Sequence, residues 1–156
     1  MNTPPQSPRS LICPPAPIAN RRRHRSRCFG GIICRTNGHE PQYLVVKGRQ
    51  TGIWSFPKGH SRHEEHPLDC AKREIQEETG IPIQILDLPH PRLHRLKGGI
   101  YYLFDLTPFL PYDPSDPSNQ FTPQDTMEIE ETRWVTREEM TYLISNSGIK
   151  DFLEKK

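Results

Sequence analysis

Three glutamates within five residues, Glu74, Glu77 and Glu78, constrain this chain more than any other feature. If the segment is helical, their carboxylates fall within an arc of about 100° on one side of the helix. Like charges four residues apart destabilise an isolated helix by roughly 0.2–0.5 kcal/mol, so this clustering predicts a bound cation. Carboxylate oxygens suit hard divalent ions, with Mg²⁺ as the first expectation and Mn²⁺ as the second.

The flanking residues predict where this helix begins and ends. Pro67 suits the first helical position, where a missing N–H costs nothing, and Gly80 suits the position just past the last turn. Leu68, Ala71 and Ile75 form a narrow apolar stripe, roughly 100° around the helix from the acidic side. The helix is therefore expected to pack on a sheet while its carboxylates face a cleft.

The segment 59–81 resembles the Nudix box, whose pattern is Gly, five residues, Glu, seven residues, then Arg-Glu-aliphatic-any-Glu-Glu-any-Gly-aliphatic. Every specified place is filled, by Gly59, Glu65, Arg73, Glu74, Ile75, Glu77, Glu78, Gly80 and Ile81. The resemblance implies an enzyme that hydrolyses pyrophosphate linkages with divalent metal ions. A looser similarity to the family extends over about residues 28–145.

The resemblance also implies a role for each residue of the box. The metal ligands would be the carbonyl of Gly59 and the carboxylates of Glu74, Glu77 and Glu78. Arg73 would orient one of these ligands and pair with the glutamate one turn later, and Glu65 would brace the loop or act through a water. Family members differ in which glutamate is the general base. Glu128 is our candidate for a catalytic carboxylate outside the box, and its alternative is a solvated residue on an edge strand.

Hydrophobic patterns along the rest of the chain predict one α+β domain over residues 28–156. Strands are expected over 28–35, 42–47, 81–86, 99–106 and 126–135, and helices over 137–144 and 148–154. The first two strands should form a hairpin, and Trp54 and Phe56 should point inward. Residues 107–126 are rich in proline and should form a long loop. This order predicts a mixed β-sheet between helices, in agreement with the α/β/α sandwich that the Nudix resemblance implies.

Residues 1–27 are expected to form a disordered, proline-rich and basic tail. Its basic cluster consists of Arg21, Arg22, Arg23, Arg25 and Arg27. Three interpretations stay open for this cluster: a solvated arm, a contact with RNA or another polyanion, and a nuclear-import signal.

The four cysteines show neither a CxxC pair nor a zinc-ligand spacing, so they are expected to be reduced thiols. A zinc site that uses cysteine with His60, His63 and His66 is the alternative. No apolar run approaches the roughly 20 residues that span a bilayer. The expectation is a cytoplasmic protein without a membrane partner, whose oligomeric state the sequence does not predict.

Several cations near the box are candidates for binding phosphate. Those singled out are Lys47, Arg49, Lys58 and His60, with Arg62, Arg95 and Lys97 as further candidates. Lys58 is the strongest because it immediately precedes the proposed metal-binding glycine. Three tyrosines, Tyr43, Tyr101 and Tyr102, could stack on a base, although packing in the core is the favoured role for each.

Three segments resemble the mRNA-decapping branch of the Nudix family: 54–59, 69–71 and 128–134. The last departs from that branch at Thr132, where an aliphatic residue is usual. The resulting hypothesis is cleavage of the 5′ cap of mRNA, with release of m7GDP. The first alternative is hydrolysis of dinucleoside polyphosphates or diphosphoinositol polyphosphates, and the second is a Nudix-like module that binds without catalysis.

Overall fold

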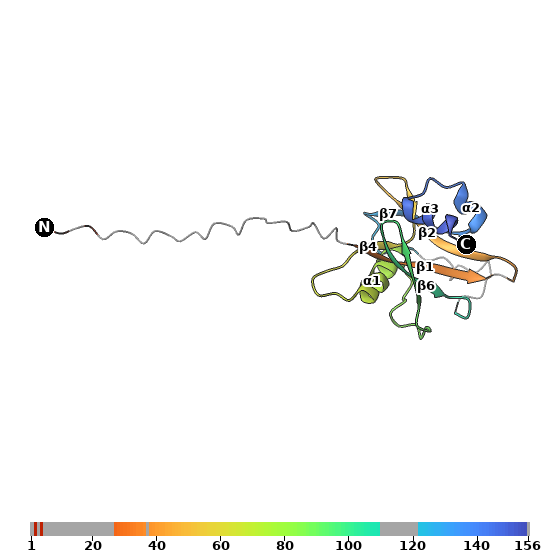
Figure 1. The fold of residues 1–156 in the computed structure, drawn as a ribbon, viewed down its shortest axis with the longest axis horizontal. Helices are drawn as coiled ribbons and strands as arrows, with labels where there is room; N and C mark the ends of the chain where they lie inside the picture. Colours follow the sequence, from red (N-terminus) through yellow and green to blue (C-terminus); the bar gives the residue numbers. More distant parts are fainter. Residues whose placement is uncertain (1, 3, 5–26, 37, 110–121, 156) are drawn as a thin grey trace.

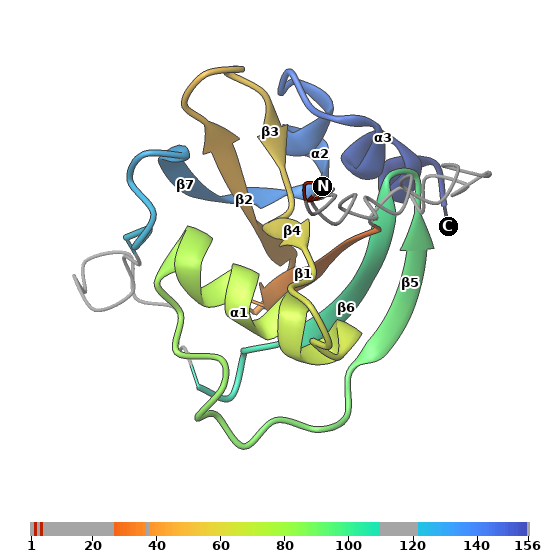
Figure 2. The same cartoon turned by 90° about the vertical axis from the view of Figure 1, so that its left-hand side faces the viewer.

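A seven-stranded mixed sheet lies between helix α1 and the pair α2 and α3 in the computed structural model of the chain (Figures 1 and 2). The structure describes residues 2, 4, 27–36, 38–109 and 122–155. The strands are β1 (Cys28–Thr36), β2 (Pro41–Gly48), β3 (Trp54–Ser55), β4 (Lys58–His60), β5 (Arg92–Leu96), β6 (Gly99–Asp105) and β7 (Ile129–Thr136). The helices are α1 (Pro67–Thr79), α2 (Arg137–Thr141) and α3 (Ser147–Glu154).

Strand β1 is the centre of the sheet. It runs parallel to β6, and it pairs antiparallel with β2 through the predicted hairpin and with β4 through the segment that opens the box. Strand β2 also pairs antiparallel with β3 and β7, and β5 pairs antiparallel with β6. The sheet is therefore mixed, as predicted.

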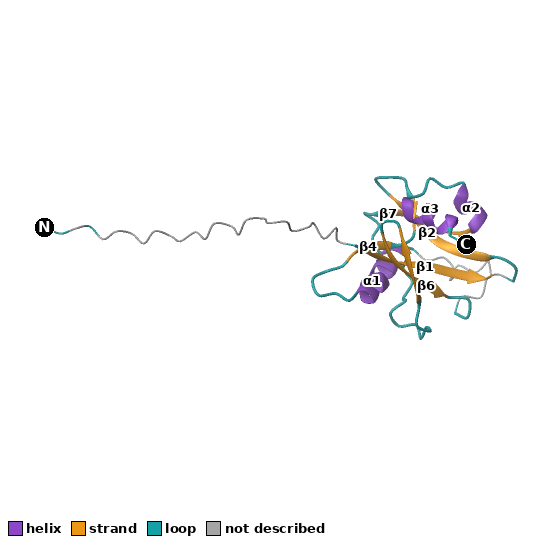
Figure 3. Ribbon diagram, viewed as in Figure 1, coloured by secondary structure: helices purple, strands orange, loops and turns teal. Residues whose placement is uncertain are grey.

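Successive residues of β1 enter two separate cores. Ile33 packs with Ile75 of α1 on one face, while Ile32 packs with Met140 and Ile149 on the other face, which α2 and α3 cover (Figure 3). Side chains on a strand alternate between faces, so a strand buried on both sides is apolar at consecutive positions. The α/β/α sandwich is confirmed.

Two glycines of β1 allow the site to form. A Cβ at Gly31 would collide with the Ile75 side chain, so this glycine lets α1 approach the sheet closely. A Cβ at Gly30 would collide with the carbonyl oxygen of Pro57, and the pairing of β1 with β4 places Phe29 opposite Gly59. Strand β1 therefore fixes both the acidic helix and the first glycine of the box.

Some predicted elements are wrong. Residues 81–86 do not form a strand: Pro82 offers no N–H, and the Ile85 N–H bonds back to the Pro82 carbonyl in a turn. Strand β5 was not predicted, because its basic sequence lacks an apolar pattern. The predicted strand 126–135 begins only at residue 129, and helix α2 ends at Thr141. Residues 1, 3 and 5–26 of the tail, and 110–121 of the proline-rich loop, lie outside the described residues.

Within the described part of the chain, no helix combines the length and the apolar composition that crossing a bilayer requires.

Ile83 and Ile85 offer a matched test of the corrected segment, because the predicted strand would have placed them on one face. Ile83 is 0% exposed and Ile85 is 82% exposed. We expect Ile83→Ala to lower the free energy of unfolding by about 2–4 kcal/mol, through lost burial and a cavity. Ile85→Ala should change it by less than about 0.5 kcal/mol. Equal losses in urea denaturation would contradict this structure of the segment.

Candidate active site

Helix α1 begins and ends where the sequence predicted. His66 caps its N-terminus by accepting a hydrogen bond from the Leu68 N–H at 3.3 Å, directly before Pro67. Gly80 ends the helix in the left-handed region at φ 78°, and its N–H donates to the Gln76 carbonyl. The close approach of α1 to β1 and β4 then buries two of its acids, Glu74 and Glu78.

One guanidinium, that of Arg73, holds three carboxylates of the box together. It makes a two-point contact with Glu65, through Nε at 2.8 Å and Nη2 at 2.9 Å. Its Nη1 donates to Glu74 at 2.9 Å and lies 3.3 Å from Glu77, which confirms the predicted pairing of Arg73 with Glu77. The hydrogen bond from Arg73 lowers the pKa of Glu65 to about 2.

Glu65 also holds the loop before α1, because its Oε1 accepts the Arg62 N–H at 3.1 Å. Arg73 reinforces this contact by donating to the His60 carbonyl at 3.0 Å. The loop that carries Gly59 is thus tied to the helix by one ion pair and two hydrogen bonds to backbone groups.

Glu78 is the most deeply buried acid of the box, at 4% exposure. Its Oε1 accepts the Lys58 backbone N–H at 3.2 Å, while its Oε2 has no hydrogen-bond partner among the described residues. Burial raises its pKa to about 8, against the opposing effect of the Lys58 N–H. Buried polar atoms are normally satisfied, so the unused oxygen marks a place for a ligand that the structure does not carry.

These donors fit a divalent cation. The Glu74 carboxylate lies against Gly59, where any Cβ would collide with it, and burial raises its pKa although Arg73 acts in the opposite direction. Among the described residues, no group of three Asp, Glu, His or Cys side chains is already arranged as a metal site. Two of the box glutamates, Glu74 and Glu77, are instead paired with Arg73. The Oε2 atom of Glu78 is the oxygen that is ready to bind an ion, and Glu74, whose charge acts on Glu78, precedes it by one turn of the helix.

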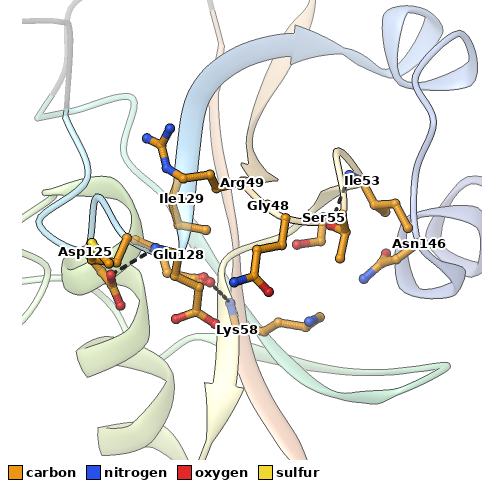
Figure 4. A pocket seen from close by; sticks show the side chains of 13 residues that line it. Gly48, Arg49, Ile53, Ser55, Lys58, Asp125, Glu128, Ile129 and Asn146 are labelled. Atoms are coloured by element: carbon orange, nitrogen blue, oxygen red, sulfur yellow. Dashed lines mark hydrogen bonds between the residues drawn. The ribbon is translucent and has the colours of Figure 1, made fainter.

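A pocket of about 650 Å³ opens beside Glu78 (Figure 4). Lys58 and Arg49 contribute cations to its wall, and Asp125 and Glu128 contribute carboxylates. The remaining lining residues are Gly48, Gln50, Thr51, Ile53, Ser55, Met127, Ile129 and Asn146. A volume of this size suits a ligand as large as a nucleotide.

The segment that carries Glu128 is attached to α1 by its backbone. The N–H groups of Gln124 and Asp125 both donate to the Glu77 carbonyl at 2.9 Å, at the C-terminal end of the helix. The Asp125 carboxylate accepts the Glu128 N–H at 3.1 Å, and the Arg49 N–H donates to the Glu128 carbonyl at 2.8 Å. Burial, followed by the charge of Asp125, raises the pKa of Glu128.

Four of the predicted site residues line one pocket: Glu78, Glu128, Lys58 and Arg49. The other predicted cations are not among its lining residues. Lys47 instead pairs with Glu130 at 3.3 Å. His60 lies against the Cys28 sulfur at 3.8 Å, and the backbones of Arg95 and Lys97 contact α3 and the residue after it.

The remaining predictions concern tyrosines, thiols and the basic arm. Tyr101 and Tyr102 are buried and Tyr43 packs on Phe152, as expected of core residues. The cysteines that the structure describes are free thiols, as predicted. Arg21, Arg22, Arg23 and Arg25 lie outside the described residues.

Asp125 and Asn146 are among the pocket residues that sequence reasoning missed. Aspartate often accepts the backbone N–H three residues later, so the spacing of Asp125 and Glu128 was a usable signal. Asn146 carried no signal for a ligand site, because its proximity to the pocket depends on a contact with β3 that the sequence does not show.

Comparisons with known proteins agree with this geometry. A family model described as the NUDIX domain matches residues 24–155. The m7GpppN-mRNA hydrolase of Saccharomyces cerevisiae is 28% identical over 118 residues, which is 75% of this chain and 12% of the yeast protein. An mRNA-decapping protein of African swine fever virus is 50% identical over 36 residues, which is 23% of this chain and 15% of the viral protein. The chain therefore spans only a small part of the curated relatives it matches.

Among solved structures, the chain is similar to the Ap4A hydrolase of C. elegans, with a TM-score of 0.60 and 21% sequence identity. The match covers 82% of this chain and 92% of that one. At this identity the likeness shows the fold.

The raised pKa of Glu78 predicts a pH-dependent stability in the absence of metal. The unfolded carboxyl group loses its proton near pH 4.5 and the folded one near pH 8, so this residue penalises folding increasingly between those values. We expect the unfolding free energy of Glu78→Gln to rise relative to that of wild type as the pH increases. In EDTA, the difference between the two proteins should grow by on the order of 3 kcal/mol from pH 5 to pH 8.

Urea denaturation across this pH range measures that gain. The control is Glu138→Gln on α2, whose side chain is exposed, and its difference from wild type should stay constant. A constant difference for Glu78→Gln as well would show that Glu78 is ionised at pH 5.

Proposed function

Because the chain belongs to the Nudix hydrolase family, we propose that it hydrolyses a phosphoanhydride bond in a nucleoside-diphosphate-linked substrate. The substrate we propose is the 5′ cap of mRNA, with m7GDP as a product. The similarity to the decapping proteins of yeast and African swine fever virus favours this substrate. The observation that carries the reaction type is the buried Glu78, whose unpartnered oxygen lies beside a pocket that also holds cationic side chains.

The residues of the box would hold Mg²⁺ or Mn²⁺ through oxygen atoms. The proposed ligands are the Gly59 carbonyl and the carboxylates of Glu74, Glu77 and Glu78. When bound, such an ion neutralises phosphate charge and makes a coordinated water more acidic. Arg73 would position Glu74 and Glu77 through the contacts described above, and Glu65 would keep the Gly59 loop in place.

The pocket residues would bind the phosphates and accept the proton. Lys58 and Arg49 line the pocket, and their charges would attract phosphate oxygens. Glu78 and Glu128 both line the pocket, which supports either of them as the group that would take a proton from the attacking water. Burial raises the pKa of Glu128, which strengthens it as a base.

Hydrolysis of dinucleoside or diphosphoinositol polyphosphates is the second candidate. The cations of the pocket suit any polyphosphate, and the fold is similar to that of an Ap4A hydrolase. A module that binds without catalysis is the least favoured reading, because it would have no use for the buried carboxylates of Glu74 and Glu78.

Glu78→Gln tests the proposed reaction. The variant keeps the size of the side chain but loses the negative charge, so we expect turnover of capped RNA with Mg²⁺ to fall by about 10²–10⁴-fold. Release of m7GDP is the measurement, with Glu154→Gln, at the exposed end of α3, as the control. Unchanged turnover in Glu78→Gln would contradict the proposed role. Diadenosine tetraphosphate, a diphosphoinositol phosphate and ADP-ribose, assayed at equal concentration, identify the preferred substrate.

We also propose that Arg21, Arg22, Arg23, Arg25 and Arg27 contact the RNA backbone. Each phosphate contact to a single strand steepens the salt dependence of binding by about 0.7 in a log–log plot. Replacing the five arginines by glutamine should therefore weaken binding of capped RNA and flatten its salt dependence, while hydrolysis of a cap dinucleotide stays unchanged. An unaltered slope would exclude this arm as an RNA contact.

A further inference from the structure

The pocket has an end that the proposed chemistry does not use. Asp125 and Glu128 lie at one end in Figure 4, Ile53 and Asn146 lie at the other, and Lys58 lies between them. A substrate with its phosphates near Lys58 would extend its nucleoside toward Asn146. The side chains at this end therefore determine which base fits.

The backbone of Asn146 is held firmly at this end. Its N–H donates to the Trp54 carbonyl at 3.0 Å, and the Trp54 N–H donates to the Ile144 carbonyl at 2.8 Å. Ser145 pairs with Trp54 in a parallel bridge, and the Trp54 side chain is buried. The loop before α3 is thus joined to β3, which fixes the position of Asn146 on the pocket wall.

Capping of α3 fixes the orientation of the Asn146 amide. Its Oδ1 accepts the Ile149 backbone N–H at 3.0 Å. A backbone N–H only donates, so the oxygen must face the helix and the amide nitrogen must face the other way. Figure 4 shows this nitrogen directed toward the pocket. Turning the amide over would remove the cap, so this wall presents a permanent hydrogen-bond donor.

One exposed apolar side chain lies at this end of the pocket. Ile53 is in the turn between β2 and β3 and is 38% exposed. Within the described lining of the pocket no side chain is aromatic. Aliphatic contact from Ile53 is accordingly what this end of the pocket offers to the flat face of a base.

We propose that this end binds the purine base of the substrate and that Asn146 selects a base with a hydrogen-bond acceptor at position 6. Guanine and hypoxanthine carry an oxygen there, whereas adenine carries an amino group, which also donates. If adenine were bound, the Asn146 amide N–H and the adenine 6-amino group would face each other as two donors. Neither would have an acceptor, so adenine is disfavoured. This inference rests on the proposed function and narrows its substrate class to 6-oxopurine nucleotides.

Short RNAs of one sequence, joined through a 5′–5′ triphosphate to guanosine, inosine or adenosine, test the inference. We expect wild-type kcat/KM to favour guanosine and inosine over adenosine by about tenfold, the effect of one matched hydrogen bond. Asn146→Asp keeps an oxygen for the Ile149 N–H and removes the donor, so this preference should fall below about threefold. Asn146→Ser, which also caps the helix, should lose the preference in the same way.

The ratio between substrates separates base selection from any general loss of activity. Equal turnover of the three RNAs by wild type, or an unchanged ratio in both variants, would overturn the assignment of Asn146. If wild type cleaves none of them with Mg²⁺, the proposed function fails, and calorimetric binding of GDP, IDP and ADP tests the inference separately. Tighter binding of GDP and IDP that both variants lose would support it, and equal binding of all three would overturn it.

Discussion

The contact between Arg73 and three carboxylates is the interaction on which the site depends. Without a cation among them, Glu65, Glu74 and Glu77 would repel one another across the helix and the preceding loop. Arg73 is one turn from Glu77 and reaches Glu65 with two nitrogens, so it joins the loop to the helix. A lysine has one charged atom and could not make the two-point contact while also bonding Glu74. The guanidinium thus allows an acidic helix to fold before any metal is bound.

Glu78 differs from these acids because, among the residues that the structure describes, no cationic side chain forms an ion pair with it. One oxygen of Glu78 accepts a hydrogen bond from the Lys58 N–H, and burial favours the protonated form of the carboxyl group. This arrangement destabilises the folded protein at neutral pH and makes the carboxylate available to a cation that enters the pocket. Stability that is lost when Glu78 ionises can return when a divalent ion binds, so metal binding and the charge state of Glu78 are coupled.

The sequence predicted what local patterns determine. The ends of α1 and its apolar stripe follow from capping residues and hydrophobic periodicity. The pattern Ile81, Ile83, Ile85 failed because Pro82 turns the chain, so that the first two isoleucines reach the core and the third does not. Strand β5 escaped prediction because its pairing with β6, and not its own sequence, makes it a strand.

The pocket required information that no local pattern contains. Glu128 lies beside Glu78 because two backbone N–H groups of the preceding segment bind the Glu77 carbonyl at the end of α1. These donors satisfy a carbonyl at the negative end of the helix dipole, which holds an acidic segment next to an acidic helix despite their charges. Asn146 reaches the same pocket through the unrelated contact with Trp54. One wall of the pocket is therefore attached to helix α1 and the other to the sheet and α3. The base selection proposed for Asn146 could therefore change by substitution in the second wall while the carboxylates of the first wall keep their positions.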